Sequence, residues 1–224
     1  MIKIVQCWDD GVVDDIRLCE LLREKGAKAS FNLNAGLHGA QRGSRWRYQD
    51  CKDVLRLAKS ELLSAYDGFT IANHSYSHPW ANQIQIEQWE REVVDGRKAL
   101  QDIFGQEILG FAYPYSVTDQ KIAEVVRAAG HVYARDGQFA TPCFPPADPM
   151  QFAADCHFAA PDFWERYAKA KAAKASVFYF WGHSYELVTE ADWQAFAKKI
   201  ERFNDDPDAD WADLEGLFQP EFAK

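Results

Sequence analysis

The stretch Met1-Ile-Lys-Ile-Val-Gln-Cys7-Trp8-Asp9-Asp10-Gly11 decides the predicted fold, because an apolar run passes directly into two carboxylates and a glycine. Residues 2–8 have the length and composition of a buried strand. Gly11 lets the chain turn sharply after this strand, so the side chains of Asp9 and Asp10 can face one pocket. Two carboxylates this close repel each other unless a cation lies between them. An aspartate here would also favour the start of the next helix, which is the alternative interpretation of Asp10.

Beyond this turn, strand and helix patterns alternate along the chain. Strands are predicted at residues 2–8, 28–33, 69–72, 109–112, 132–134 and 176–181, and helices at residues 13–25, 49–64, 86–104, 118–129, 163–175 and 189–203. Thr118 is the predicted N-cap of its helix, and Gly26, Gly105 and Gly130 are predicted helix stops. Residues 34–48 and 138–161 are predicted to be irregular covers.

Strands separated by helices of this length indicate parallel βαβ units. Six or seven such units favour a closed or nearly closed barrel. We therefore predict an α/β fold, a distorted (β/α) barrel of about seven parallel strands, formed by residues 1–224 as a single domain.

Several polar or distinctive residues fall where a predicted strand ends: Asp9 and Asp10, His74, Pro114 and Tyr115, and His183. In a parallel βα barrel the carboxyl ends of the strands form one rim, and active sites are built there. We therefore expect these residues to lie close together.

His74 and His78 are spaced so that a helix or tight turn brings both rings to one side. On their own, two histidines in a polar stretch could equally be surface residues. One carboxylate with two imidazoles leaves a divalent metal with an open position, as in hydrolytic rather than structural sites. Because Asp10 is predicted at the same rim, we favour a metal site formed by Asp10, His74 and His78. Asp9 would lie beside it as a base.

His183 follows the apolar run Val-Phe-Tyr-Phe-Trp-Gly, which makes it a candidate general acid. The alternative is a core histidine with its hydrogen bonds satisfied. Trp80 and Trp181 lie near the motifs, where aromatic faces suit the apolar faces of sugar rings, although tryptophan is also a common core residue.

Charge and composition exclude some classes of partner. The 224 residues carry a formal charge of -9, which argues against nucleic acid or an anionic membrane as the main partner. No apolar stretch approaches the ~20 residues of a membrane span. The N-terminus has no signal-peptide layout, so we expect a cytoplasmic protein or a trimmed secreted form. The five cysteines are expected to be free thiols. Oligomeric state cannot be deduced from this sequence.

In its motifs the chain resembles the polysaccharide deacetylase family, the NodB-homology carbohydrate esterases, from Ile2 to about Tyr185. Cys7-Trp-Asp-Asp-Gly11 is similar to the family's first motif, T-F-D-D-G, and His74-Ser-Tyr-Ser-His78 to its second. Phe111-Ala-Tyr-Pro-Tyr115 resembles the third motif, R-x-P-Y, and Trp181-Gly-His183 the fifth, L-x-H.

The resemblance implies a role for each matching position. Asp10, His74 and His78 would hold the metal, most simply Zn²⁺, with Co²⁺, Ni²⁺ or Mn²⁺ as alternatives. Asp9 would be the general base and His183 the general acid, and the backbone N–H of Tyr115 would help to stabilise the oxyanion. Trp181 would form the slot for the acetyl methyl group. Independently of the resemblance, we predict Trp80 and Pro114 as further substrate-binding residues, with Trp80 as a platform for a sugar ring.

The chain departs from the family pattern at two positions. Cys7 stands in place of the first-motif threonine, and Ala112 in place of the third-motif arginine, which in the family pairs with the catalytic base. Arg135, at the end of the next predicted strand, is our hypothesis for the missing charge. Asp136, Asp155 and Asp162 are candidates for orienting His183.

The function implied is a metal-dependent hydrolase that removes acetyl groups from an N- or O-acetylated sugar or oligosaccharide. Two alternatives are a hydrolase of a small non-sugar amide on the same fold and a non-catalytic sugar-binding domain. The absent arginine favours the second alternative, whereas the presence of both Asp9 and His183 opposes it.

Overall fold

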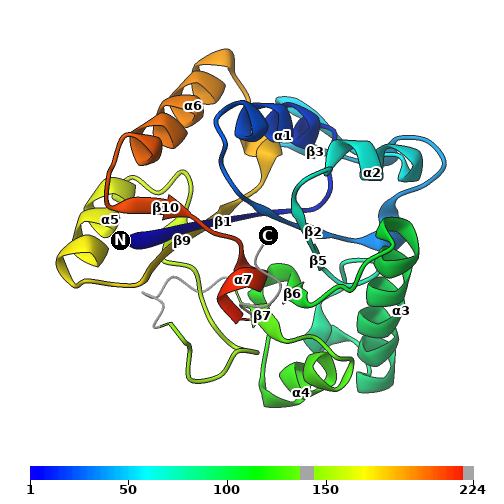
Figure 1. Ribbon diagram of the computed structural model, residues 1–224. Coiled ribbons are helices and arrows are strands. Elements are labelled where there is room, and N and C mark those ends of the chain that lie inside the picture. The colour runs from blue at the N-terminus through cyan, green and yellow to red at the C-terminus, as the bar shows by residue number, and fades with distance from the viewer. Residues whose placement is uncertain (137–143, 219–224) are drawn as a thin grey trace.

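Strand β1 (Ile2–Asp9) lies between β2 and β9 in the interior of a curled parallel sheet with helices around it (Figure 1). The structure is a computed structural model that describes residues 1–136 and 144–218. Its main sheet has the order β7-β6-β5-β2-β1-β9-β8, with every neighbouring pair parallel. The other strands of this sheet are β2 (Ser30–Leu33), β5 (Thr70–Asn73), β6 (Gly110–Ala112), β7 (Tyr133–Arg135), β8 (Cys156–His157), β9 (Val177–Gly182) and β10 (Ala209–Trp211), the last of which pairs with the start of β1.

The helices are α1 (Asp14–Glu24), α2 (Leu62–Ala65), α3 (Ile86–Phe104), α4 (Gln120–Ala128), α5 (Phe163–Ala172), α6 (Glu190–Asn204) and α7 (Leu214–Phe218). A separate antiparallel hairpin is formed by β3 (Gly43–Tyr48) and β4 (Lys52–Arg56).

One segment contacts both outer edges of the curled sheet. Phe152 forms a parallel bridge with Arg135 of β7, and the N–H of Asp136 donates to the carbonyl of Phe152 (3.0 Å). A few residues later, the same segment becomes β8 and pairs with β9. This arrangement nearly closes the sheet, so the predicted distorted (β/α) barrel of about seven parallel strands is confirmed.

Alternate residues of β1 face two different parts of the core, as expected for a strand. Ile4 and Trp8 pack in the cluster between the sheet and the helices, whereas Val5 and Cys7 join Tyr179 in a second cluster. Because both faces are apolar, β1 is buried along almost its whole length, as is usual for a parallel strand.

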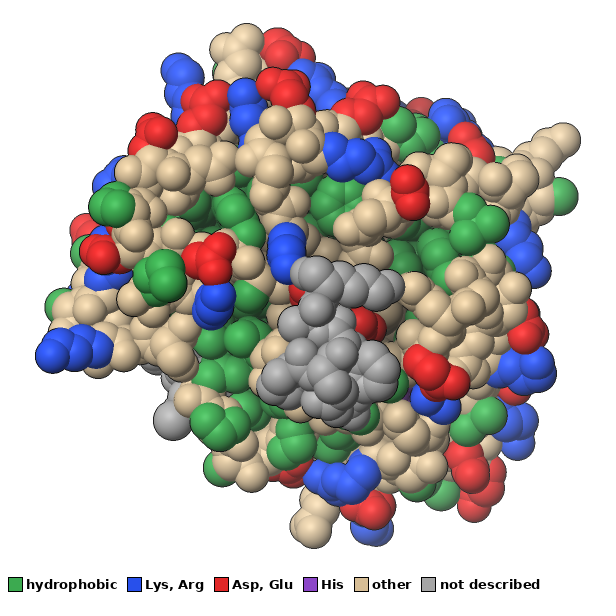
Figure 2. Space-filling view, viewed as in Figure 1, with side chains coloured by type: hydrophobic (Ala, Val, Ile, Leu, Met, Phe, Trp, Pro, Cys, Tyr) green, Lys and Arg blue, Asp and Glu red, His purple; other side chains and the backbone are tan. Residues whose placement is uncertain are grey.

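The C-terminal segment covers the amino ends of the strands. β10 pairs with the first residues of β1, and Leu214 and Phe218 of α7 pack in the same cluster as Val5. α7 lies beside β7, where Phe218 stacks on Tyr133 with ring centroids 5.0 Å apart (Figure 1). From the same side, acidic and basic side chains are interspersed around the outline (Figure 2). No charge of one sign dominates this view.

Most predicted elements are confirmed. The six predicted strands each occur within two residues of their expected bounds, and five of the six helices within three. Gly26, Gly105 and Gly130 have the positive φ of helix stops, at 68°, 65° and 89°. The predicted cap Thr118 was wrong by one residue. The side chain of Asp119 caps α4 instead, accepting a hydrogen bond from the N–H of Ile122 (2.8 Å).

The helix predicted at residues 49–64 was wrong up to residue 58, whereas residues 59–64 are helical. The irregular structure predicted for residues 34–48 was wrong at residues 43–48, which form β3. The N–H of Val13 donates to the carbonyl of Leu55 (2.8 Å), and the N–H of Leu57 to the carbonyl of Gly11 (3.1 Å). The turn after β1 thus draws these residues into extended backbone pairing. This pairing with distant residues outweighs the weak local preference for helix.

Two sequence predictions concern residues that lie partly outside the described chain. The irregular cover predicted at residues 138–161 contains β8, and its residues 138–143 lie outside the described chain. Cys7, Cys19, Cys51 and Cys156 are free thiols, while Cys143 lies outside the described residues. Within residues 1–136 and 144–218, no helix has the length and apolar character that crossing a membrane requires.

Candidate active site

The motifs of the sequence meet in one pocket at the carboxyl ends of the strands. Asp9 and Arg135 are the last residues of β1 and β7, and His74 and His183 follow β5 and β9 directly. The pocket has a volume of about 410 Å³. It is lined by Asp9, Asp10, Trp46, Arg56, His74, His78, Tyr113, Tyr115, Ser116, Arg135, Trp181, His183 and Tyr185.

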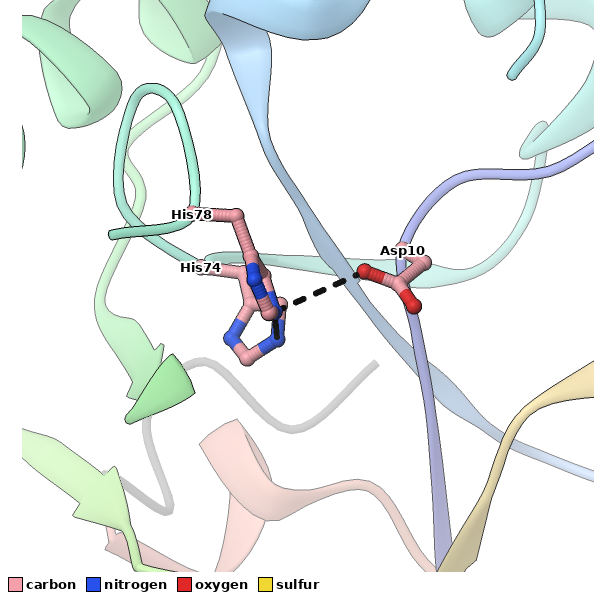
Figure 3. Close-up of side chains that lie close together, drawn as sticks. All are labelled: Asp10, His74 and His78. Carbon is pink, nitrogen blue, oxygen red and sulfur yellow. Dashed lines mark hydrogen bonds and ion pairs between the residues drawn. The ribbon is translucent and has the colours of Figure 1, made fainter. Parts of the chain in front are cut away.

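Asp10, His74 and His78 form a compact group of three metal-ligand donors (Figure 3). The Nε2 atoms of the two histidines are 3.2 Å apart, and Nε2 of His78 is 3.7 Å from Oδ1 of Asp10. Ligands at about 2.0–2.2 Å from a tetrahedral zinc ion are separated from one another by roughly 3.3 Å. The donor set and its spacing therefore fit one divalent metal ion.

Both histidines are prepared for metal binding by their surroundings. Nδ1 of the buried His74 donates to the carbonyl oxygen of Ala112 (2.7 Å), which leaves Nε2 unprotonated and free to bind. Burial lowers the pKa of His74 and, with the neighbouring His74 ring, lowers the pKa of His78 to about 4. Both rings are therefore neutral near pH 7, as metal ligands must be.

Several residues around the pocket have left-handed backbone conformations. Asp10, Ser75, His78, Tyr115 and Ser116 have φ values of 87°, 63°, 62°, 56° and 59°. Such values are uncommon for residues other than glycine, and they concentrate at functional sites. The three loops are thus held in conformations that residues of these types adopt only under constraint from the surrounding fold.

Gly96 of α3 allows the loop that carries the histidines to lie against the helix. A Cβ atom at Gly96 would lie 2.6 Å from Oδ1 of Asn73 and 3.1 Å from backbone atoms of Ser75 and Tyr76. We expect Gly96→Ala to displace this loop, to weaken metal binding and to lower the free energy of unfolding by about 1–3 kcal/mol. Metal titration and denaturant unfolding would measure both effects.

The matched control is Val94→Ala on the exposed side of α3, where the side chain is 43% exposed. It should leave metal affinity unchanged. Equal metal affinity in Gly96→Ala and the wild type would show that the close approach is not needed.

Asp9 is buried next to the metal-ligand group and is held on both oxygens. Nη2 of Arg135 donates to Oδ2 (2.5 Å) and Nδ2 of Asn32 to Oδ1 (2.6 Å). Burial alone would raise the pKa of this carboxyl, but Arg135, the nearby histidines and the Asn32 hydrogen bond hold it below its ordinary range. Asp9 is therefore an ionised carboxylate with a fixed orientation.

Arg135 occupies the position next to Ala112 on the neighbouring strand. The two residues are register partners in the β6–β7 pair. The guanidinium reaches Asp9 from there and lies over the ring of Trp181 (4.9 Å). The cation absent at Ala112 thus comes from one strand over, at the same level of the barrel.

His183 lines the same pocket as His74. Its Nε2 is 3.9 Å from Oδ2 of Asp10, and its Nδ1 is 3.3 Å from Oε1 of Glu186. Burial opposes a charge on this ring, but Glu186, Asp10 and Asp9 outweigh it and raise the pKa above its ordinary value. His183 can therefore carry a proton near neutral pH.

A family model described as polysaccharide deacetylase matches residues 2–134, which is more than half of the sequence. This chain belongs to the polysaccharide deacetylase family. Members of this family are hydrolases that act on acetyl groups, and the matched region contains the first three motifs. No curated protein matches the sequence of this chain at a significant level.

Solved structures share the fold of this deacetylase at low sequence identity. A family 4 carbohydrate esterase from Bacillus anthracis has a TM-score of 0.64 and 17% identity, over 96% of this chain and 82% of that one. The Xyl-CE4 domain of a xylanase from the hindgut metagenome of Trinervitermes trinervoides gives 0.62 and 15%, over 99% and 92%. The Streptococcus pyogenes deacetylase PplD, solved with acetate, gives 0.56 and 17%, over 66% and 61%.

Of the three substrate-binding residues predicted from the sequence, only one lines the pocket. Trp181 lines the pocket, whereas Trp80 and Pro114 are not among its lining residues. Trp80 stacks on Tyr115, with ring centroids 3.9 Å apart, and is 41% exposed. Pro114 is buried. Trp80 thus supports Tyr115 at the pocket edge.

Arg56 is a pocket residue that the sequence analysis missed. Its Nη2 is 3.3 Å from Oδ1 of Asp10, its Nη1 bonds the Asp10 carbonyl, and Trp46 lies over the guanidinium (5.1 Å). The signal was available as a single cation inside the apolar run Val-Leu-Arg-Leu-Ala. Arg56 was not considered because residues 49–64 were predicted as a helix, and a helix there would not pair with the turn that carries Asp10.

Proposed function

We propose that this protein is a metal-dependent deacetylase of N- or O-acetylated sugars or oligosaccharides, with Zn²⁺ as the metal. One observation carries the proposal. A fixed carboxylate, Asp9, and a protonatable imidazole, His183, line the same pocket as a three-donor metal group. Such an arrangement of base, acid and metal suits hydrolysis of an acetyl amide or ester.

A zinc ion held by Asp10, His74 and His78 would supply Lewis acidity for the attacking water and the acetyl carbonyl. Asp9 is then placed to accept the proton of that water, with Arg135 and Asn32 preventing its rotation. His183 is placed to give a proton to the departing amine or alcohol. The backbone N–H of Tyr115 is proposed to donate to the oxyanion of the tetrahedral species.

The walls of the pocket favour a sugar as the substrate. Trp46 and Tyr185 pack edge to face with ring centroids 5.4 Å apart, and Tyr115 lines the same pocket. Aromatic faces with polar groups nearby suit the mixed surfaces of sugar rings. Trp181 is proposed to contact the acetyl methyl group. The contact between Arg135 and Asp9 also weakens the case for a non-catalytic binding domain, which rested on the arginine absent at Ala112.

The direct test is acetate release by the zinc-loaded protein from acetylated glucosamine and xylose oligomers, with small ureides and acetamide, followed by ammonia release, as the alternative substrates. We expect release from an acetylated oligomer, and Trp46→Ala should raise KM about 3- to 10-fold with little change in kcat, because a stacked ring contributes about 0.5–1.5 kcal/mol.

Trp164→Ala, which removes a tryptophan on α5 that does not line the pocket, is the control. Turnover of the ureides or acetamide alone would contradict the sugar proposal.

A further inference from the structure

A second cluster of titratable side chains lies behind His183. His157 at the end of β8, His183 and Glu186 offer three donor atoms within 4.8 Å of one another. His183 and Glu186 are three residues apart around a short 3₁₀ turn, where side chains at this spacing lie directly above one another. The chain therefore brings the Glu186 carboxylate to the side of the His183 ring that faces away from Asp10.

The hydrogen bonds of His157 indicate a network rather than a second metal site. Nδ1 of His157 accepts a hydrogen bond from the N–H of Ala159 (3.2 Å), so this nitrogen carries no proton. The proton of the neutral ring is then on Nε2, which lies 2.7 Å from Oε2 of Glu186. A metal ion on Nε2 would displace this proton and break the contact.

The Glu186 carboxylate is restrained on several sides. Besides the contact with His157, Oε2 accepts from the backbone N–H of His183 (3.3 Å), and Oε1 faces Nδ1 of His183 (3.3 Å). Burial would raise the pKa of Glu186, but the two histidines lower it to about 2. An ionised, immobile carboxylate therefore faces the distal nitrogen of the His183 ring.

We propose that Glu186, held in place by His157, is the positioning residue for His183. The carboxylate fixes the ring and keeps a proton on Nδ1, so that Nε2 is directed to the pocket. A carboxylate on the distal nitrogen acts in the same way wherever an imidazole must keep one orientation during proton transfer. Asp155 and Asp162, two of the candidates from the sequence, are engaged elsewhere, with the N–H of Tyr179 and with Arg166. This inference rests on the proposed role of His183 as a general acid.

The test compares two acetyl donors that differ in their need for a proton. An acetylated amino sugar releases an amine that must be protonated, whereas 4-nitrophenyl acetate releases a phenolate that leaves without one. We expect Glu186→Gln to lower kcat on the amino sugar about 10- to 100-fold, with KM and bound zinc unchanged. Turnover of 4-nitrophenyl acetate should stay within about 2-fold of wild type.

Two variants of His157 test the restraint on Glu186 and keep the test decisive if Glu186→Gln does not fold. His157→Leu removes the donor and should show the same selective loss, whereas His157→Gln retains a donor at a similar reach and should restore most of it. Asp192→Asn removes a comparable capping carboxylate at the start of α6 and is the matched control. It should behave as the wild type on both substrates.

His183→Ala separates failure of this inference from failure of the proposed function. If His183→Ala loses both activities equally, or neither, His183 is not the general acid and the proposed mechanism fails. If His183→Ala loses only amino sugar turnover while Glu186→Gln and His157→Leu behave as the wild type, the positioning role is overturned. An equal loss of both substrates in Glu186→Gln would also overturn it, because that pattern indicates general disruption of the site.

Discussion

Asp10→Ala is expected to abolish both metal binding and acetate release. Asp10 provides the anionic donor of a group whose other two members are neutral imidazoles. Its removal also leaves the Arg56 guanidinium, now 3.3 Å from Oδ1 of Asp10, as a buried cation beside the two histidines. Because Lewis acidity supplies several kcal/mol to such reactions, turnover should fall by at least ~10³-fold.

The measurement is metal stoichiometry by elemental analysis after stripping and reconstitution with zinc or cobalt. The wild type should retain about one ion per chain and Asp10→Ala none. Asp53→Ala removes a half-exposed carboxylate on the β3–β4 hairpin and should keep the wild-type stoichiometry. A wild-type protein that binds no metal, or an Asp10→Ala variant that still binds one, would refute the assignment of Asp10, His74 and His78.

Metal binding could be lost in Asp10→Ala because a carboxylate donor is removed or because the Arg56 cation is left uncompensated. Adding Arg56→Gln to Asp10→Ala separates these two causes. If the uncompensated cation matters, the double variant Asp10→Ala and Arg56→Gln should recover weak zinc binding that Asp10→Ala alone lacks. If the double variant binds no zinc either, loss of the carboxylate donor alone accounts for the effect.

The positions of the motifs could be predicted from the sequence because they depend on local patterns. Short apolar runs between amphipathic segments locate β1, β5, β6 and β9, and parallel strands place their carboxyl ends on one rim. That geometry brings Asp10 and His74 together although they are 64 positions apart. Nothing beyond strand order and direction is needed for this step.

The β3–β4 hairpin could not be predicted in the same way. Residues 49–64 contain apolar side chains at helical spacing, and the backbone pairing of Leu55 and Leu57 with the turn after β1 depends on the assembled fold. Arg56 was therefore not predicted as a pocket residue, and its contact with Trp46 depends on the assembled fold. Glu186 was overlooked for a different reason, because the candidates for orienting His183 were sought on preceding segments rather than three residues further along its own turn.

Arg135→Ala is expected to lower turnover about 10²- to 10³-fold while metal stoichiometry stays near one. The Arg135 and Asp9 side chains are 2% and 3% exposed, so the variant leaves a buried carboxylate without its counter-charge. Breaking such a pair costs about 3–5 kcal/mol of stability, which urea unfolding would detect. Arg127→Ala, which removes a half-exposed arginine paired with Glu124 and Asp148, should change neither quantity appreciably.

The register of β6 and β7 allows a sharper test than the single substitution Arg135→Ala. Because Ala112 and Arg135 are paired across neighbouring strands about 4.8 Å apart, an arginine at position 112 should also reach Asp9. The double variant Ala112→Arg and Arg135→Ala should therefore recover at least about 10-fold of the turnover that Arg135→Ala loses, and most of the lost stability. Wild-type kcat in zinc-loaded Arg135→Ala would show that Asp9 needs no partner. Loss in the single variant without recovery in the double would instead assign the loss to the contact of Arg135 with Trp181, which an arginine on β6 would not reproduce.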